Sequence, residues 1–140
     1  MRQITIVIFT VILFFLSSCM PYDSKKYVEE ILKDDILEQA ALNLQESPVT
    51  ITSFIAERSV GDCHDFYSEG DYWWPNPLDL EGPYVRRDGQ TNPENFVAHR
   101  QAMIRFSSIV GNLTSAYLLT KDNRYVENVM EHVRAWFVNE

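Results

Sequence analysis

The feature that most limits the fold of this chain is a run in which three adjacent aromatic rings stand between a glycine and two prolines. It reads Gly-Asp-Tyr-Trp-Trp-Pro-Asn-Pro and occupies residues 70–77. Glycine and proline interrupt helices, and proline removes a donor from a sheet ladder, so we predict that the run is neither helix nor regular strand. Rings held on a rigid loop suit the flat face of a sugar, whereas rings of this kind also often close a core. The sequence leaves both roles open.

The start of the chain has the three parts of a secretory signal peptide. A basic Met1-Arg2 precedes an apolar run over residues 4–16, and small residues then lead to Cys19. The apolar run has roughly 13 residues, fewer than the ~20 that span a membrane, so residues 1–18 are predicted to be a signal peptide and not a transmembrane helix. The Leu-Ser-Ser-Cys ending resembles a bacterial lipoprotein signal. We therefore expect lipidation of Cys19, with an ordinary soluble secreted protein as the alternative.

Lipidation has consequences for location and for cysteine chemistry. The mature domain, residues 19–140, would be exported and held at a membrane surface, in the periplasm or on the outer membrane. Which membrane face carries the anchor is left open. The other cysteine, Cys63, would then have no partner for an internal disulfide.

Apolar residues recur at helical spacing in three segments. The pattern predicts helices over residues 24–45, 95–119 and 123–137. Residues 59–95 hold most of the glycines and prolines, and their density of Tyr, Trp and Phe indicates an ordered loop. The fold class is therefore mainly α, with a long aromatic-rich loop followed by an antiparallel helical hairpin.

The charge distribution narrows the choice of ligand. The chain carries a net charge of −8, from 12 basic and 20 acidic side chains, which argues against nucleic acid as a partner. Residues 83–105 are an exception, because Arg86, Arg87, Arg100 and Arg105 lie there with only Asp88 and Glu94. Guanidinium groups next to aromatic rings suit an acidic sugar. The alternative is that these arginines pair with the chain's own carboxylates.

Three stretches carry a resemblance to a known family. Residues 64–77 read HDFYSEGDYWWPNP, residues 82–89 read GPYVRRDG, and the short motifs NPE and HR follow at 92–94 and 99–100. Together they resemble the N-terminal part of the alginate lyase family of polysaccharide lyases. The resemblance runs from about Tyr27 to the last residue and covers only the first part of that family's domain.

The resemblance implies a fold and a reaction. The fold would be an (α/α) toroid of helical hairpins, incomplete in this chain. The reaction would be β-elimination in a uronate-containing polysaccharide such as alginate: the substrate carboxylate is neutralised, a base removes the proton on carbon 5, and an acid protonates the leaving oxygen on carbon 4. The family's catalytic groups are expected downstream of Glu140, so no catalytic residue is assigned here. The chain is expected to be an N-terminal fragment that is inactive alone.

The candidate substrate-binding residues are Tyr72, Trp73, Trp74, Asn76, Arg86, Arg87, His99 and Arg100. For His99 and Arg100, which open a helix, a hydrogen-bonding role at the helix entry is the alternative. The histidines lie far apart in sequence and indicate no metal site, and we expect no cofactor.

We expect the protein to be a monomer. Its expected partners are an acidic polysaccharide and, through the lipid on Cys19, a membrane. Two other functions remain open from the sequence. One is noncatalytic glycan binding by a surface lipoprotein. The other is glycoside hydrolysis on a similar toroid, with Glu69 and Asp71 as its carboxylates. Neither the particular polyuronate nor endo or exo action follows from the sequence.

Overall fold

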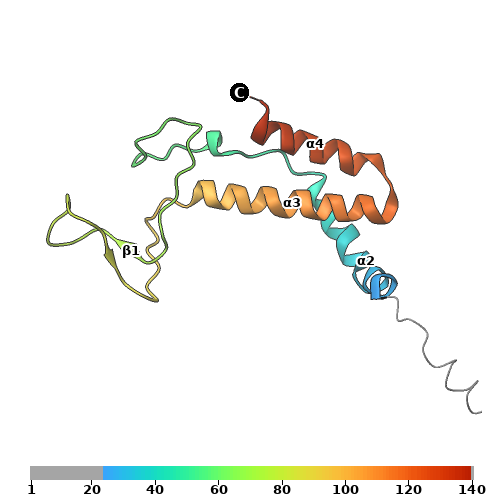
Figure 1. The fold of residues 1–140 in the computed structure, drawn as a ribbon, viewed down its shortest axis with the longest axis horizontal. Coiled ribbons are helices and arrows are strands. Elements are labelled where there is room, and N and C mark those ends of the chain that lie inside the picture. The colour runs from blue at the N-terminus through green and yellow to red at the C-terminus, as the bar shows by residue number, and fades with distance from the viewer. Residues whose placement is uncertain (1–23, 140) are drawn as a thin grey trace, which may run out of the picture. The chain divides into compact units, whose positions relative to one another are not determined.

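A computed structural model describes residues 24–139 of the chain (Figure 1). In order, the elements are helix α2 (Ser24–Asn43), the 3₁₀ turn η1 (Ile51–Ser53), strands β1 (Trp73–Trp74) and β2 (Val85–Arg86), and helices α3 (Ala98–Thr120) and α4 (Asn123–Phe137). The mainly helical fold is confirmed. The predicted signal peptide and the lipidation of Cys19 lie outside the described residues and stay predictions, as does closure into a toroid.

The chain divides within α2 into two units, with the boundary between Lys33 and Asp34. In the first unit, only the opening turns of α2 are described. The second unit contains the hydrophobic core and all the candidate binding residues. None of the described helices combines the length and the apolar character needed to cross a bilayer.

The core lies where α3 packs against α4 and the end of α2. Its buried members are Ala40, Ile109, Leu113, Ala116 and Tyr125. Alanine at two of these positions removes side-chain bulk, so that the helices can approach closely while Leu113 fills the space between them. The side chains of α2 that border this cluster, Ile36 and Leu37, lie on the face expected from the helical spacing.

A short turn makes α3 and α4 an antiparallel hairpin, as predicted, and the two helices lie side by side (Figure 1). Lys121 ends α3 in the left-handed region, with φ at 60°, and its N–H donates to the carbonyl of Tyr117 at 2.7 Å. Asp122 then caps α4 by accepting from the backbone N–H of Arg124 at 3.0 Å. This local chemistry reverses the chain within a few residues.

One prediction about the loop was wrong. We predicted no regular strand in residues 70–77, but Trp73 and Trp74 pair antiparallel with Arg86 and Val85. The pairing is possible because both prolines of this run, Pro75 and Pro77, lie after the end of β1 and remove no donor from a ladder only two residues long. The rest of the segment between the helices is irregular, as expected.

Candidate functional site

The aromatic loop, defined as residues 59–95, precedes α3 and lies at the end of α3 away from the α3–α4 turn (Figure 1). Two buried amides hold it in place: Asn92 is 4% exposed and Asn95 is 7% exposed. The side-chain amide of Asn95 donates to the carbonyls of Gly70 at 2.6 Å and Trp73 at 3.0 Å. Asn92 donates to the same Trp73 carbonyl at 3.1 Å and to Asn95 Oδ1 at 2.8 Å. The backbone that carries the rings is therefore held by hydrogen bonds from these buried amides.

Glu69 ties the start of the aromatic loop to its surroundings through an almost buried carboxylate, 8% exposed. Its Oε1 accepts from Arg58 Nη1 at 2.6 Å, and its Oε2 accepts from the backbone N–H of Phe96 at 2.6 Å. The hydroxyls of Tyr67 and Tyr84 lie 3.3 and 3.4 Å from Oε1. Arg58 supplies the positive charge that a carboxylate in this position needs.

The pKa values of this cluster move in the direction that burial and charge dictate. Burial, followed by the negative charge of Glu69, raises the pKa of Tyr67 above its ordinary value. The hydrogen bond to Tyr84 raises the pKa of Arg58, against an opposing effect of burial. The raised pKa of Tyr67 keeps its phenol neutral at neutral pH, and the raised pKa of Arg58 keeps its guanidinium charged.

The carboxylates predicted as a possible hydrolase pair are both engaged by arginines. Glu69 pairs with Arg58, and Asp71 pairs with Arg100. A glycosidase needs one carboxyl group protonated and the other free. These two fit structural roles better than that division of labour.

The two tryptophans of β1 face opposite sides of the hairpin. In an antiparallel pair, residues directly opposite share a face and successive residues alternate. Trp73 therefore lies on the face of Arg86, and Trp74 on that of Val85. Tyr72 and Trp73 remain 42% and 45% exposed. The rings are available to a ligand, but they do not form one continuous platform.

Arg87 lies over the ring of Trp74, with its guanidinium carbon 4.8 Å from the ring centroid. Its backbone N–H donates to the carbonyl of Tyr72 at 2.8 Å, and Trp74 Nε1 donates to the carbonyl of Gln90 at 3.0 Å. Both members of the stack are thus held by the loop. No carboxylate among residues 24–139 forms an ion pair with Arg87. Its charge is free to meet an anion.

The other predicted arginines are differently placed. Arg86 Nε lies 2.6 Å from Asp88 Oδ1 at the surface, and Arg100 pairs with Asp71. An incoming anion would have to displace those carboxylates. Asn76 uses its Oδ1 to accept from the backbone N–H of Leu78 at 3.0 Å, which shapes the turn after β1.

His99, in the first turn of α3, is 2% exposed. Its Nδ1 accepts from the backbone N–H of Tyr67 at 3.0 Å, which leaves the proton on Nε2, 3.4 Å from the carbonyl of Phe54. The ring of Phe96 meets it edge-on at 4.8 Å. This geometry fits the helix-entry role, the alternative stated for this residue, and keeps the imidazole away from a surface ligand.

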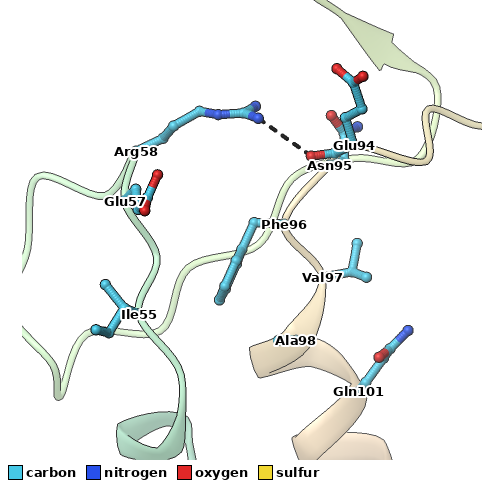
Figure 2. A pocket seen from close by; sticks show the side chains of 9 residues that line it. All are labelled: Ile55, Glu57, Arg58, Glu94, Asn95, Phe96, Val97, Ala98 and Gln101. Atoms are coloured by element: carbon cyan, nitrogen blue, oxygen red, sulfur yellow. Dashed lines mark hydrogen bonds between the residues drawn. The ribbon is translucent and has the colours of Figure 1, made fainter.

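A hollow of about 410 Å³ lies between residues 55–58 and 94–101 (Figure 2). Figure 2 shows Arg58 reaching across it to the carbonyl of Glu94, at 3.3 Å. Glu57 and Glu94 are among its lining residues, and Arg58, its one cation, is already paired with Glu69. The hollow therefore has no unpaired cation to offer, so it is a poorer uronate site than the half-buried stack of Arg87 on Trp74.

Comparison with known proteins gives the same family as the sequence motifs of the aromatic loop. The profile of the family described as Alginate lyase matches residues 50–140. The chain belongs to the alginate lyase family. Its match contains the whole aromatic loop and the α3–α4 hairpin.

A solved structure agrees with that membership. The chain is similar to the crystal structure of an alginate lyase from Bacteroides ovatus, with 30% sequence identity and a TM-score of 0.67. The similarity covers 81% of this chain and 32% of that one, so the chain spans about a third of the length of this relative. A search of curated proteins gave no match.

Two residues that hold the loop of this alginate lyase family chain were not predicted from its sequence. Asn95 was not a candidate, because Gly70 and Trp73, whose carbonyls it binds, lie 25 and 22 residues away in sequence. Arg58 was not one either, because its partners Glu69 and Tyr84 lie 11 and 26 residues away along irregular chain. Periodicity carries no information about such contacts.

Proposed function

We propose that the protein is a polysaccharide lyase that cleaves a uronate-containing polysaccharide, such as alginate, by β-elimination. In this proposal the aromatic loop forms part of the wall of the substrate cleft. The observation that carries it is the stack of Arg87 on Trp74, which presents a guanidinium without a carboxylate partner among residues 24–139. Family membership supports the reaction class.

The chemistry of the stack suits a uronate. A guanidinium can donate two parallel hydrogen bonds to a carboxylate. Stacking on a ring already restricts the arginine side chain, so less conformational entropy is lost when the ligand binds. The exposed ring of Tyr72, whose carbonyl accepts from the Arg87 N–H, offers apolar contact to a pyranose ring, whereas Trp73 lies on the other face of the hairpin. Neutralising the carboxylate also favours β-elimination, because negative charge develops beside it when the proton on carbon 5 departs.

We place the proton-transferring groups outside the described residues. Near the rings, the carboxylates of Glu69 and Asp71 pair with arginines, and the imidazole of His99 is buried. A base must reach the proton that it removes. The 140 residues alone are therefore proposed to have little activity, and their contribution is binding and orientation of the polymer.

The proposal includes export and anchoring. Residues 1–18 would direct the chain out of the cytoplasm, and Cys19 would carry the lipid that holds the enzyme, as a monomer, at a membrane surface in the periplasm or on the outer membrane. Mass spectrometry of the protein from membranes would test this, since acylated Cys19 should be the first residue.

The test of the reaction is ultraviolet absorbance during incubation of the protein, in the longest form that its gene encodes, with alginate, glucuronan and related polyuronates. β-Elimination leaves a carbon–carbon double bond conjugated to the carboxylate, so absorbance should rise with at least one polymer. No rise with any of them would overturn the lyase proposal. Saturated reducing ends would indicate hydrolysis instead.

A second candidate function is glycan binding without cleavage. It is favoured by the acid–base groups nearest the rings, because Glu69 and Asp71 pair with arginines and His99 is buried. Retention of the protein on immobilised alginate, without unsaturated product in the absorbance assay, would select it.

A further inference from the structure

A turn before the aromatic run brings three different metal-ligating side chains together. One carboxylate oxygen of Asp62, the sulfur of Cys63 and a ring nitrogen of His64 all lie within 4.8 Å of one another. The distance between Cys63 Sγ and His64 Nδ1 is 3.6 Å, and that between His64 Nδ1 and Asp62 Oδ1 is 3.7 Å. The absence of a metal site predicted from the sequence rested on the wide spacing of the histidines, which does not bear on this cluster of neighbours.

The backbone of this turn holds the three side chains on one side. The N–H of Asp65 donates to the carbonyl of Asp62 at 3.1 Å, and the N–H of Asp62 donates to Asp65 Oδ2 at 2.9 Å. The N–H of His64 donates to Asp62 Oδ1 at 2.8 Å. A Cβ at Gly61 would lie 2.2 Å from Asp65 Oδ2 and 2.7 Å from Asp65 Cβ, so any other residue there would push the Asp65 side chain away.

The sulfur–nitrogen distance matches one edge of a tetrahedral metal site, the nitrogen–oxygen distance is longer than its edge, and sulfur and oxygen lie within 4.8 Å of each other. With Zn–S near 2.3 Å and Zn–N near 2.0 Å, tetrahedral angles place sulfur and nitrogen about 3.6 Å apart and nitrogen and oxygen about 3.3 Å apart. The observed separations are 3.6 and 3.7 Å. The side chains of His64 and Asp62 are 63% and 77% exposed, so small rotations can close the remaining gap.

The donor set also selects the kind of ion. Thiolate and imidazole favour zinc-like transition metals, whereas Ca²⁺ and Mg²⁺ prefer oxygen. The charges of a thiolate and a carboxylate balance those of a divalent cation, and Asp65 adds a further negative charge next to the cluster. Asp62 Oδ1 accepts one backbone bond, which leaves other lone pairs of the carboxylate for a metal.

We propose that Asp62, Cys63 and His64 bind a zinc-like divalent transition-metal ion, with the fourth position open to water. Binding releases the proton of the Cys63 thiol to solvent. The site is distinct from the uronate surface at Arg87 and does not depend on the proposed lyase activity.

The probe is Co²⁺, added to the full chain in detergent with a reductant that does not bind metals. Tetrahedral coordination by a thiolate should produce a sulfur-to-cobalt charge-transfer band at a ratio of one ion per chain, and Zn²⁺ should displace it. Cys63→Ser should abolish the band, and His64→Ala should weaken Co²⁺ binding at least about tenfold. Cys19→Ser, which removes the other cysteine of the chain, is the matched control and should leave the band unchanged.

A second variant tests the preorganised turn without removing a donor. Gly61→Ala forces Asp65 away from Asp62 and should weaken Co²⁺ binding about 10- to 100-fold while the charge-transfer band keeps its shape. Absence of the band in the parent protein would overturn the proposal. So would a band that survives in Cys63→Ser.

Discussion

At the scale of single residues, the placement of the candidate site depends on two asparagines that touch no proposed ligand. Asn92 and Asn95 converge on the carbonyl of Trp73 from a position with almost no access to water. A buried carbonyl that loses its donor keeps its desolvation cost without compensation. The rings are therefore held by amides behind them and not by contacts among the rings themselves.

Replacing Asn95 by alanine should lower the free energy of unfolding by about 2–3 kcal/mol, because the Gly70 carbonyl loses its side-chain donor and the Trp73 carbonyl loses one of two. Urea denaturation followed by tryptophan fluorescence measures the change. The matched control is Asn76→Ala, which removes a single bond to the N–H of Leu78 and should cost less than about 1 kcal/mol. Equal losses in the two variants would contradict this account of the anchor.

The aromatic rings and the arginines could be found from sequence, because residue type alone points to sugar and carboxylate binding. Which arginines pair with a carboxylate and which do not could not be predicted from sequence. Arg86 and Arg87 are neighbours, yet Arg86 pairs with Asp88 and Arg87 stacks on Trp74. That difference arises from the two-residue pairing of β1 with β2, which is too short to leave an alternating pattern in the sequence.

At the scale of elements, helical periodicity predicted all three described helices and missed only their ends. The predicted start of α3 at residue 95 was three residues early. The side chain of Asn95 hydrogen-bonds to carbonyls of the loop and does not cap the helix. The predicted end of α2 at residue 45 was two residues late. There, the backbone N–H groups of Gln45 and Glu46 donate to carbonyls three residues earlier. These bonds form a tighter turn that ends the α-helix.

Helix α3 owes its place to the face that carries Leu113, which has no exposed surface. Leu113→Ala should lower the free energy of unfolding by about 3–5 kcal/mol, from lost burial and the cavity left between the helices. Leu118→Ala on the same helix, where the leucine is 62% exposed, should cost no more than about 1 kcal/mol. Chemical denaturation of both variants tests the packing, and comparable losses would show that the helices do not pack as described.

Helix α4 should lose stability in acid through its cap. The side-chain hydrogen bond from Arg124, followed by the backbone bond from the same residue, lowers the pKa of Asp122. The stabilising contribution of the ionised carboxylate is therefore complete above the pKa of the unfolded state and is lost as pH falls through the lower pKa of the folded state, below about pH 4.

The variant Asp122→Asn keeps an acceptor for the Arg124 N–H but has no charge to lose. Its melting temperature should therefore fall less steeply than that of the parent between pH 5 and pH 3, as measured by circular dichroism. Identical slopes for the two proteins would contradict the assignment of this pKa shift to the cap.

At the scale of the whole molecule, the net charge of the chain has the same sign as the charge of the proposed ligand. A chain with a net charge of −8 repels a polyuronate over long range, so affinity must come from a local arrangement of cations and rings. Five of the seven arginines among residues 24–139 form ion pairs with the chain's own acids, and the stack of Arg87 on Trp74 is the exception within the aromatic loop. The affinity for a uronate is therefore assigned to this stack.

The most direct test is isothermal titration of an oligouronate into the parent protein, Arg87→Gln and Arg86→Gln at low salt. Loss of a charge-assisted pair predicts at least about a tenfold weaker Kd for Arg87→Gln, whereas Arg86→Gln, already paired with Asp88, should change Kd less than about threefold. The same oligosaccharide with its carboxylates reduced to alcohols should bind the parent and Arg87→Gln equally. Undiminished binding of the oligouronate by Arg87→Gln would contradict the claim that this guanidinium receives the substrate carboxylate.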